Sequence, residues 1–199
     1  MENRNYVDLF IAPIQLTDLD LNIDSLIEFC YEMKRKDEKG VELTNIGGWQ
    51  SNDVFNETHT EFAKLKKKIE EEINVYHQKI QLKKNLEEKI GNIWININGK
   101  GALNEIHQHH YSILSGAFYL RGEAPIAFRH PYRDINTYFW DRDIIENWNV
   151  VNSGIFTVAP KMNSLLVFPA WVEHKVLMNK EETDRITISF NTGIQEINR

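Results

Sequence analysis

The chain has 199 residues, 42% of them hydrophobic, and its formal net charge at pH 7 is −6. This length suits a single domain over residues 1–199, and the hydrophobic content excludes a disordered or fibrous chain. The acidic balance argues against nucleic acid as a partner. The single cysteine, Cys30, excludes an internal disulfide and a thiolate zinc site. No apolar run approaches the length of a membrane helix, so we expect a cytoplasmic protein without a membrane partner.

The first part of the chain, residues 1–90, is predicted to be mainly helical. Pro13 interrupts the first apolar run, which suits an edge strand or an extended lead-in. Apolar residues then recur every three or four positions over 23–33, which predicts a short amphipathic helix. The segment 45–53 consists of turn-forming residues around Trp49, so we expect an ordered loop anchored by that indole.

The longest helix is predicted to begin near Thr58. Thr58 and Glu61 have the spacing of a capping box, and apolar residues follow at helical spacing over 62–80. Further apolar residues extend the prediction as far as a stop at Gly91. This helix is the main element expected to cover the rest of the fold.

The second part, residues 91–199, has the period of β-strands. Isoleucines alternate with polar or aromatic residues over 92–98. Without helices between its strands, this part cannot form a parallel sheet, which leaves a sandwich, a barrel or a jelly roll. An insertion over 133–153 carries Trp140 and Trp148 and is a candidate lid. Further strand-like runs cover residues 113–121, 126–130, 154–158, 164–169 and 185–191.

Histidines provide the main chemical signal. On a strand, His107 and His109 point to the same side and can offer two imidazoles to one metal, while His110 points elsewhere. His174 follows an apolar strand and can complete the set. Neutral imidazole suits iron, zinc, copper and nickel, so the spacing does not name the metal. The alternative is that these are surface or hydrogen-bonded histidines.

The last predicted strand, residues 185–191, separates its side chains into two faces. One face is apolar, and the other carries Arg185 and Thr187 among polar residues. If the polar face is the outside of the sheet, it is ordinary solvent exposure. If it lines a pocket, Arg185 can pair with a carboxylate, with Thr187 as its hydroxyl neighbour. The two interpretations predict opposite burial for Arg185.

Four blocks of sequence resemble one family. The segments TNIGGWQSNDVF, NEIHQHHYSILSGAFYL, SLLVFPAWVEHKV and DRITISFN resemble the iron(II)- and 2-oxoglutarate-dependent oxygenases of bacteria and bacteriophages, which are similar to prolyl hydroxylases. The resemblance extends over residues 45–191 in ordered blocks and leaves the first helix and the insertion poorly matched. As a set the blocks are fairly specific, although no single block is.

The resemblance implies a mainly β fold of the α+β class, a double-stranded β-helix (a cupin-like jelly roll) with N-terminal helices packed outside. It implies Fe(II), 2-oxoglutarate and O2 as reactants, and conversion of 2-oxoglutarate to succinate coupled to hydroxylation of a substrate. The implied metal ligands are His107, His109 and His174, and the implied contacts of the 2-oxoglutarate carboxylate are Arg185, Thr187 and Tyr119.

One position departs from the wider class. Most of its enzymes use two histidines and one carboxylate, but here the second ligand position is His109. Three histidines also bind zinc in hydration enzymes, so the identity of the metal depends on this position. Glu105 and Glu173 are the nearest carboxylates, and we expect neither to be a ligand, because Glu105 is outside the matched motif and Glu173 should point away.

The sequence does not decide whether the substrate is a protein side chain, a nucleobase or a small metabolite. Candidate contacts are Asn104, His130 and Trp140, although a loop hydrogen bond by Asn104 and a turn role for His130 are the competing interpretations. Two other functions compete with an oxygenase. One is a cupin-like metalloprotein that does not use 2-oxoglutarate, and the other is a non-catalytic phage β-sandwich module with incidental histidines.

Overall fold

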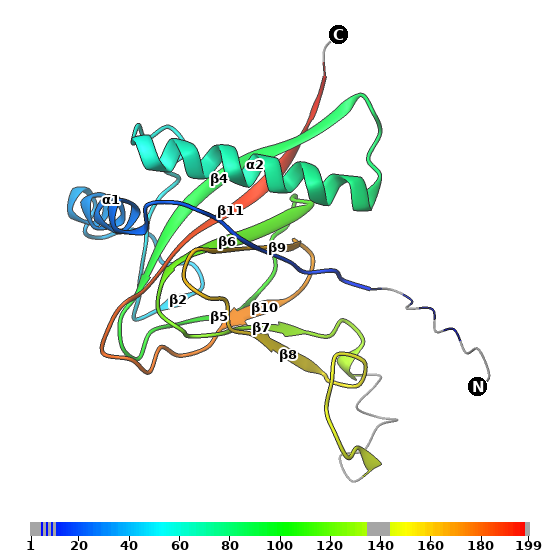
Figure 1. Cartoon of the computed structure of the whole chain (residues 1–199). Coiled ribbons are helices and arrows are strands. Elements are labelled where there is room, and N and C mark those ends of the chain that lie inside the picture. The colour runs from blue at the N-terminus through cyan, green and yellow to red at the C-terminus, as the bar shows by residue number, and fades with distance from the viewer. Residues whose placement is uncertain (1–4, 6, 8, 10, 135–143, 198–199) are drawn as a thin grey trace.

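The computed structural model describes residues 5, 7, 9, 11–134 and 144–197 of the chain. Within this part, two antiparallel sheets lie opposite each other, and helices cover the outer face of the larger sheet (Figure 1). The larger sheet has the strand order β1-β9-β6-β11-β4-β3, and the smaller has the order β2-β5-β10-β7-β8. Two opposed antiparallel sheets that exchange strands in this way form a jelly roll, as expected.

Both helices lie in the first part of the chain, as predicted, with the short strands β1, β2 and β3 before and between them, and the remaining strands follow. The helices are α1 (Ile23–Lys36) and α2 (Thr60–Ile80). The strands are β1 (Gln15–Asp18), β2 (Asn45–Ile46), β3 (Trp49–Gln50), β4 (Leu86–Asn98), β5 (Leu103–His107), β6 (Leu114–Arg121), β7 (Ile126–Arg129), β8 (Ile155–Val158), β9 (Ser164–Pro169), β10 (His174–Val176) and β11 (Arg185–Glu196).

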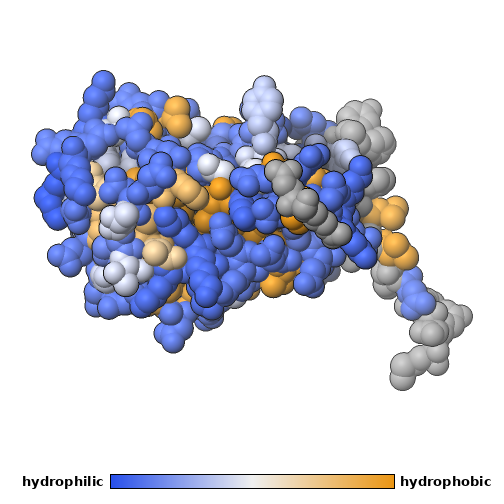
Figure 2. Space-filling view, turned by 90° about the horizontal axis from the view of Figure 1, so that it is seen from above, coloured by the Kyte–Doolittle hydropathy of each residue, from blue (hydrophilic) through white to orange (hydrophobic). Residues whose placement is uncertain are grey.

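The main core lies between the helices and the outer face of the larger sheet. β4 and β11 pair along their whole length, which aligns their alternating apolar side chains on this face. The helices cover them with apolar stripes, because buried residues recur in α1 and α2 at spacings of three and four. Figure 2 views the molecule from this helical side and shows a mainly hydrophilic surface. The buried apolar residues of the two strands include Ile93, Ile95, Ile97, Ile186, Ile188 and Phe190.

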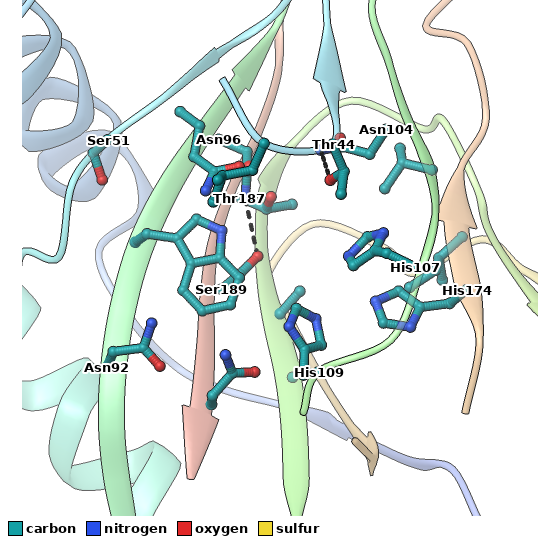
Figure 3. Close-up of a pocket in the computed structure, with 18 of the residues that line it drawn as sticks. Thr44, Ser51, Asn92, Asn96, Asn104, His107, His109, His174, Thr187 and Ser189 are labelled. Carbon is teal, nitrogen blue, oxygen red and sulfur yellow. Dashed lines mark hydrogen bonds between the residues drawn. The ribbon is translucent and has the colours of Figure 1, made fainter. Parts of the chain in front are cut away.

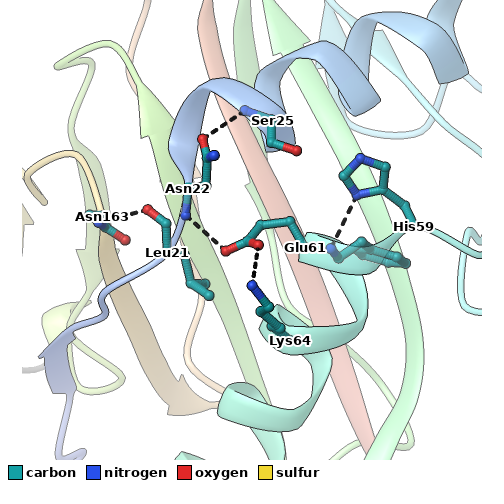
Figure 4. A network of polar contacts seen from close by, with 8 residues as sticks. Leu21, Asn22, Ser25, His59, Glu61, Lys64 and Asn163 are labelled. Carbon is teal, nitrogen blue, oxygen red and sulfur yellow. Dashed lines mark hydrogen bonds and ion pairs between the residues drawn. The ribbon is translucent and has the colours of Figure 1, made fainter.

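The two helices begin side by side and are capped together (Figure 4). The backbone N–H of Asn22, the N-cap of α1, donates to Glu61 at 2.9 Å. The N-cap of α2 is His59, whose Nδ1 accepts from the N–H of Phe62 at 3.3 Å. The predicted capping box of Thr58 and Glu61 is therefore wrong, because the glutamate caps the neighbouring helix instead of its own.

The predicted extension of the long helix to Gly91 is also wrong. α2 ends at Ile80, and Gln81 adopts the left-handed conformation with φ of 52°. The chain then returns as β4 from Leu86, paired with β11 as far as Glu196. Helical spacing of a few apolar residues is outweighed here by a continuous ladder of backbone hydrogen bonds.

The segment before α2 forms one side of the space between the sheets. β2 pairs with β5 in the smaller sheet, whereas β3 pairs with β4 in the larger one. The indole N–H of Trp49 donates to the carbonyl of Asp37 at 2.9 Å, and the ring is buried. The expected anchored loop is confirmed, with two short strands added, and β1 is the expected edge strand after Pro13.

The insertion is described only in part. Trp140 lies outside the described residues, and the exposed Trp148 does not contribute to the cavity between the sheets. Neither described helix has an apolar stretch that could cross a membrane.

Candidate metal centre

Three histidines meet between the two sheets (Figure 3). His107 ends β5 and lies directly opposite His174, the first residue of β10, in the antiparallel pairing of these strands. One ring nitrogen from each of these two residues and from His109 can be chosen so that all lie within 4.8 Å of one another. The expectation that these three imidazoles converge is confirmed.

His109 reaches this cluster by a route that differs from the prediction. It lies beyond the end of β5, so it does not share a strand face with His107. Its backbone N–H donates to the carbonyl of Ala170 at 3.0 Å, which fixes the chain after the strand. The T-shaped arrangement of the two rings, at 89°, lets them approach one point from different directions.

Backbone carbonyls orient two of the rings. Nδ1 of His107 lies 2.7 Å from the carbonyl oxygen of Glu105, and Nδ1 of His174 lies 2.9 Å from that of Val172. A carbonyl oxygen can only accept, so in each ring Nδ1 carries the proton. Nε2 is then left with its lone pair, which is the tautomer that a metal ligand needs.

Burial keeps the rings neutral. Desolvation lowers the pKa of His174 to about 3 and that of His109 to about 4, and it also lowers the pKa of His107. Each ring therefore presents a lone pair at neutral pH. Neither nearby glutamate joins them, because Glu105 is exposed and Glu173 pairs with Arg129 at 3.2 Å. The cluster that could hold a metal therefore consists of three neutral imidazoles and no carboxylate.

The cluster opens into a cavity of about 410 Å³. At its closed end, Arg185 is 2% exposed, which excludes the interpretation of its strand face as solvent-exposed. Its Nη1 donates to the hydroxyl of Thr187 at 3.4 Å, and its Cζ lies 5.0 Å from the centre of the Tyr119 ring. Nε of Arg185 and the hydroxyl of Tyr119 are both buried without a hydrogen-bond partner among the described residues. A carboxylate would accept from all of these donors.

Gly122 allows the chain to pack against this arginine. Its φ is +90°, and a Cβ there would lie 2.7 Å from Cα of Arg185. Any side chain at this position would both strain the turn after β6 and push the start of β11 away. The closed end of the cavity therefore depends on a glycine that the sequence pattern did not single out.

The three candidate substrate contacts have different outcomes in the structure. Asn104 lines the cavity, but its amide donates to Thr44 at 3.3 Å and accepts from Asn98 at 3.0 Å, so it holds the loop in place. His130 does not line the cavity, and its Nδ1 accepts from the N–H of Tyr132 at 3.0 Å, as its turn interpretation predicts. Trp140 lies outside the described residues.

A row of polar residues on β4 lines the cavity and was missed as a functional feature. Asn92, Trp94 and Asn96 share the inner face of the strand. The amide nitrogen of Asn96 donates to Ser189 on β11 at 3.0 Å, while its Oδ1 is buried without a partner among the described residues. The alternation with isoleucines was visible, but only the position of β4 beside β11 assigns this face to the cavity.

Comparison with known families identifies the family of the chain. A family model described as "Putative 2OG-Fe(II) oxygenase" matches residues 92–191, which include the three histidines, Tyr119 and Arg185. The chain belongs to the 2OG-Fe(II) oxygenase family. The search of curated proteins found no match to this chain.

Solved structures share the fold of the oxygenase at low identity. A prolyl-4-hydroxylase from Pseudomonas putida aligns with a TM-score of 0.62 and 15% identity, covering 94% of this chain and 95% of its own. HygX from Streptomyces hygroscopicus, with nickel and 2-oxoglutarate bound, aligns with a TM-score of 0.61 and 12% identity, covering 92% and 83%. The epimerase SnoN from nogalamycin biosynthesis aligns at 0.62 and 10%, covering 93% and 81%. These likenesses confirm the expected double-stranded β-helix.

The residues of this oxygenase fit the groups that the family implies. Three neutral nitrogen donors suit a divalent transition metal and leave further coordination positions for other ligands. The unpartnered Nε of Arg185 and hydroxyl of Tyr119 suit the far carboxylate of 2-oxoglutarate. Both sets face the same cavity.

Proposed function

We propose that this protein is an iron(II)- and 2-oxoglutarate-dependent hydroxylase that converts 2-oxoglutarate to succinate and CO2 while it oxidises a second substrate. The observation that carries the proposal is the pairing of two features in one cavity. Three converging imidazoles lie on its wall, and a buried, incompletely paired guanidinium lies at its closed end. A metal-binding protein that did not use a dicarboxylate would have no need to bury Arg185 there.

His107, His109 and His174 would hold the metal. Burial keeps their lone pairs available, and the two carbonyl contacts at Nδ1 fix the rings of His107 and His174 before any ligand arrives. The bound iron, with 2-oxoglutarate and O2, would supply the oxidising chemistry. The role of the protein is to set the position of each reactant.

Arg185, Tyr119 and Thr187 would bind the far carboxylate of 2-oxoglutarate. A guanidinium donates to a carboxylate through parallel N–H groups, and the phenol adds a further donor. Because this end of the cavity is closed, the charge pair is shielded from water and is stronger than at a surface. This contact would orient the 2-oxo acid end towards the histidines.

A specific observation favours a second candidate, a three-histidine metalloprotein that does not use 2-oxoglutarate. The ligand set lacks the carboxylate common in iron oxygenases, and three histidines also hold zinc in hydration enzymes. This candidate explains the metal ligands, but it gives no partner to the guanidinium. Binding of 2-oxoglutarate therefore separates the two functions.

The test begins with anaerobic protein loaded with Fe(II) and titrated with 2-oxoglutarate. We expect a visible charge-transfer absorption and, after oxygen is admitted, succinate formation. The exposed His110 provides a matched control, because His110→Ala should leave both signals unchanged. If the protein binds metal without any response to 2-oxoglutarate, the second candidate is correct. If it binds no metal, the non-catalytic module is correct.

A further inference from the structure

We propose that the open part of the cavity takes a small ring compound that is neutral or cationic and carries several N–H or O–H groups. This inference rests on the proposed function and names the class of its second substrate. Sugars with amino groups and nucleosides share this chemistry. Three features of the cavity support it: an aromatic surface, a set of side-chain amides and a particular balance of charge.

The aromatic surface is Trp94. Its indole lines the cavity from β4, and its centre lies 5.7 Å from that of the His109 ring. A ring placed on this indole would lie beside the metal ligands, within reach of the reacting centre. Flat bases and the C–H faces of sugar rings both stack on indoles. The position of Trp94 therefore favours a ring over a linear substrate.

Amide side chains surround this indole. Asn92 and Gln50 line the cavity, and their side chains form no hydrogen bond with other described residues. Asn191 faces Asn92 across the β4–β11 pair and has only its oxygen engaged, by the hydroxyl of Ser115 at 2.6 Å. Deeper in the cavity, Oδ1 of Asn96 still lacks a donor. Such amides recognise groups that both donate and accept hydrogen bonds. An apolar substrate would leave the donors and acceptors of these amides without partners.

The charge of the cavity argues against an anionic substrate. Among the described residues that line it, Arg185 is the single lysine or arginine, and Asp53 is the single acid. With neutral histidines, the two positive charges of the metal would be balanced by the two negative charges of 2-oxoglutarate, which also engages Arg185. No cation is left for a phosphate, and the exposed Asp53 at the rim favours an amine.

The size of the cavity limits the part of the substrate that enters it to one small moiety. Its 410 Å³ is near the lower end of the range for small-molecule sites, and 2-oxoglutarate would occupy part of it. The remaining space accommodates about one ring beside Trp94.

The experiment uses the full chain loaded with Zn(II) and 2-oxoglutarate, which allows binding without turnover. Glucosamine and adenosine are titrated by calorimetry beside glucosamine 6-phosphate and adenosine 5′-monophosphate. We expect at least one of the unphosphorylated compounds to bind, at least about tenfold more tightly than its phosphate ester. Tighter binding of a phosphate ester, or no binding by either unphosphorylated compound, would overturn the inference.

Three variants and one control locate the site. Trp94→Ala should weaken binding by about tenfold or more, since an aromatic stack contributes about 1–3 kcal/mol, and Trp94→Phe should restore part of it. Trp171→Phe, at an exposed indole that does not line the cavity, is the matched control. Asp53→Asn should weaken glucosamine binding and leave adenosine unaffected. Equal binding by parent and Trp94→Ala would refute this location.

A failure of this inference can be told apart from a failure of the proposed function. Binding of 2-oxoglutarate is measured first, in the absence of any ring compound. If 2-oxoglutarate does not bind, the proposed function fails. If it binds but the order of the ring compounds is reversed, only the inference about the substrate fails.

Discussion

The two faces of β4 and β11 have the same alternating pattern and opposite roles. On the outer face, isoleucines and Phe190 pack beneath the helices and are fully buried. On the inner face, Arg185, Thr187, Asn96 and Ser189 are also buried, but they line a cavity. At these positions burial is nearly complete on both faces, so the polarity of a side chain there does not indicate its exposure.

The difference between the faces lies in what satisfies them. The outer face is complete within the protein, because apolar side chains need only close packing. The inner face leaves a guanidinium nitrogen on β11 and the amide oxygens of Asn96 and Asn98 on β4 without partners among the described residues, and the neighbouring β6 adds the phenol of Tyr119. Buried polar groups in this condition are costly, and they are retained where a ligand completes them. The predictions below test this contrast.

The largest effect is expected opposite the inner face, at His174. His174→Ala removes the most buried of the three imidazoles and should abolish succinate formation, because two ligands cannot hold the metal in place. Metal content after dialysis should fall together with activity. Unchanged succinate production in this variant would refute the assignment of the metal centre.

Neighbouring residues of β11 test the two faces directly. Ile188→Ala, on the outer face, should lower the free energy of unfolding by about 2–5 kcal/mol, because it opens a cavity in the packed core. Ser189→Ala, on the inner face, should lower it by about 1 kcal/mol through loss of the hydrogen bond from Asn96. Urea unfolding measures both. Equal losses would mean that the inner face is packed like the outer one.

Arg185→Met should separate stability from binding. The dissociation constant for 2-oxoglutarate should rise more than about 30-fold, because one partner of a buried charge pair is lost. Without ligand, the variant should be at least as stable as the parent protein. The substitution replaces an incompletely paired buried cation with an apolar side chain of similar volume. Calorimetry and urea unfolding check the two halves. Retained binding would place the carboxylate elsewhere.

These contrasts show what the sequence could and could not predict. His107 and His109 were predicted from their clustering, Arg185 from the polar face of the last strand, and His174 from motifs that are ordered along the chain as in the family. The polar row of β4 was missed because alternation alone does not state which side of a sheet a second sheet will cover. Glu61 was misassigned for a different reason, because its partner, the backbone N–H of Asn22, is remote in sequence.

The pH dependence of the metal-free protein should reveal the buried imidazoles. Unfolding exposes His174, whose pKa then returns from about 3 to its ordinary 6.5. As the pH falls below 6.5 the unfolded chain takes up a proton that the folded chain does not, so stability present above pH 6.5 is lost, by about 2 kcal/mol at pH 5. Urea unfolding of EDTA-treated protein measures this, and His174→Gln should show a shallower decline. An identical decline in both would contradict the assignment.

The smallest effect is expected at Tyr31, which links α1 to the start of β11. Its hydroxyl donates at 2.6 Å to Asp184, the residue immediately before Arg185 in the chain, and accepts from Arg121. Tyr31→Phe should lower the free energy of unfolding by about 1 kcal/mol and raise the dissociation constant for 2-oxoglutarate by a few-fold, because the backbone that positions the guanidinium is less constrained. Tyr111→Phe, at a fully exposed tyrosine, is the control. A change in stability without a change in 2-oxoglutarate binding would show that the outer helices hold the sheet together but do not position the residues of its inner face.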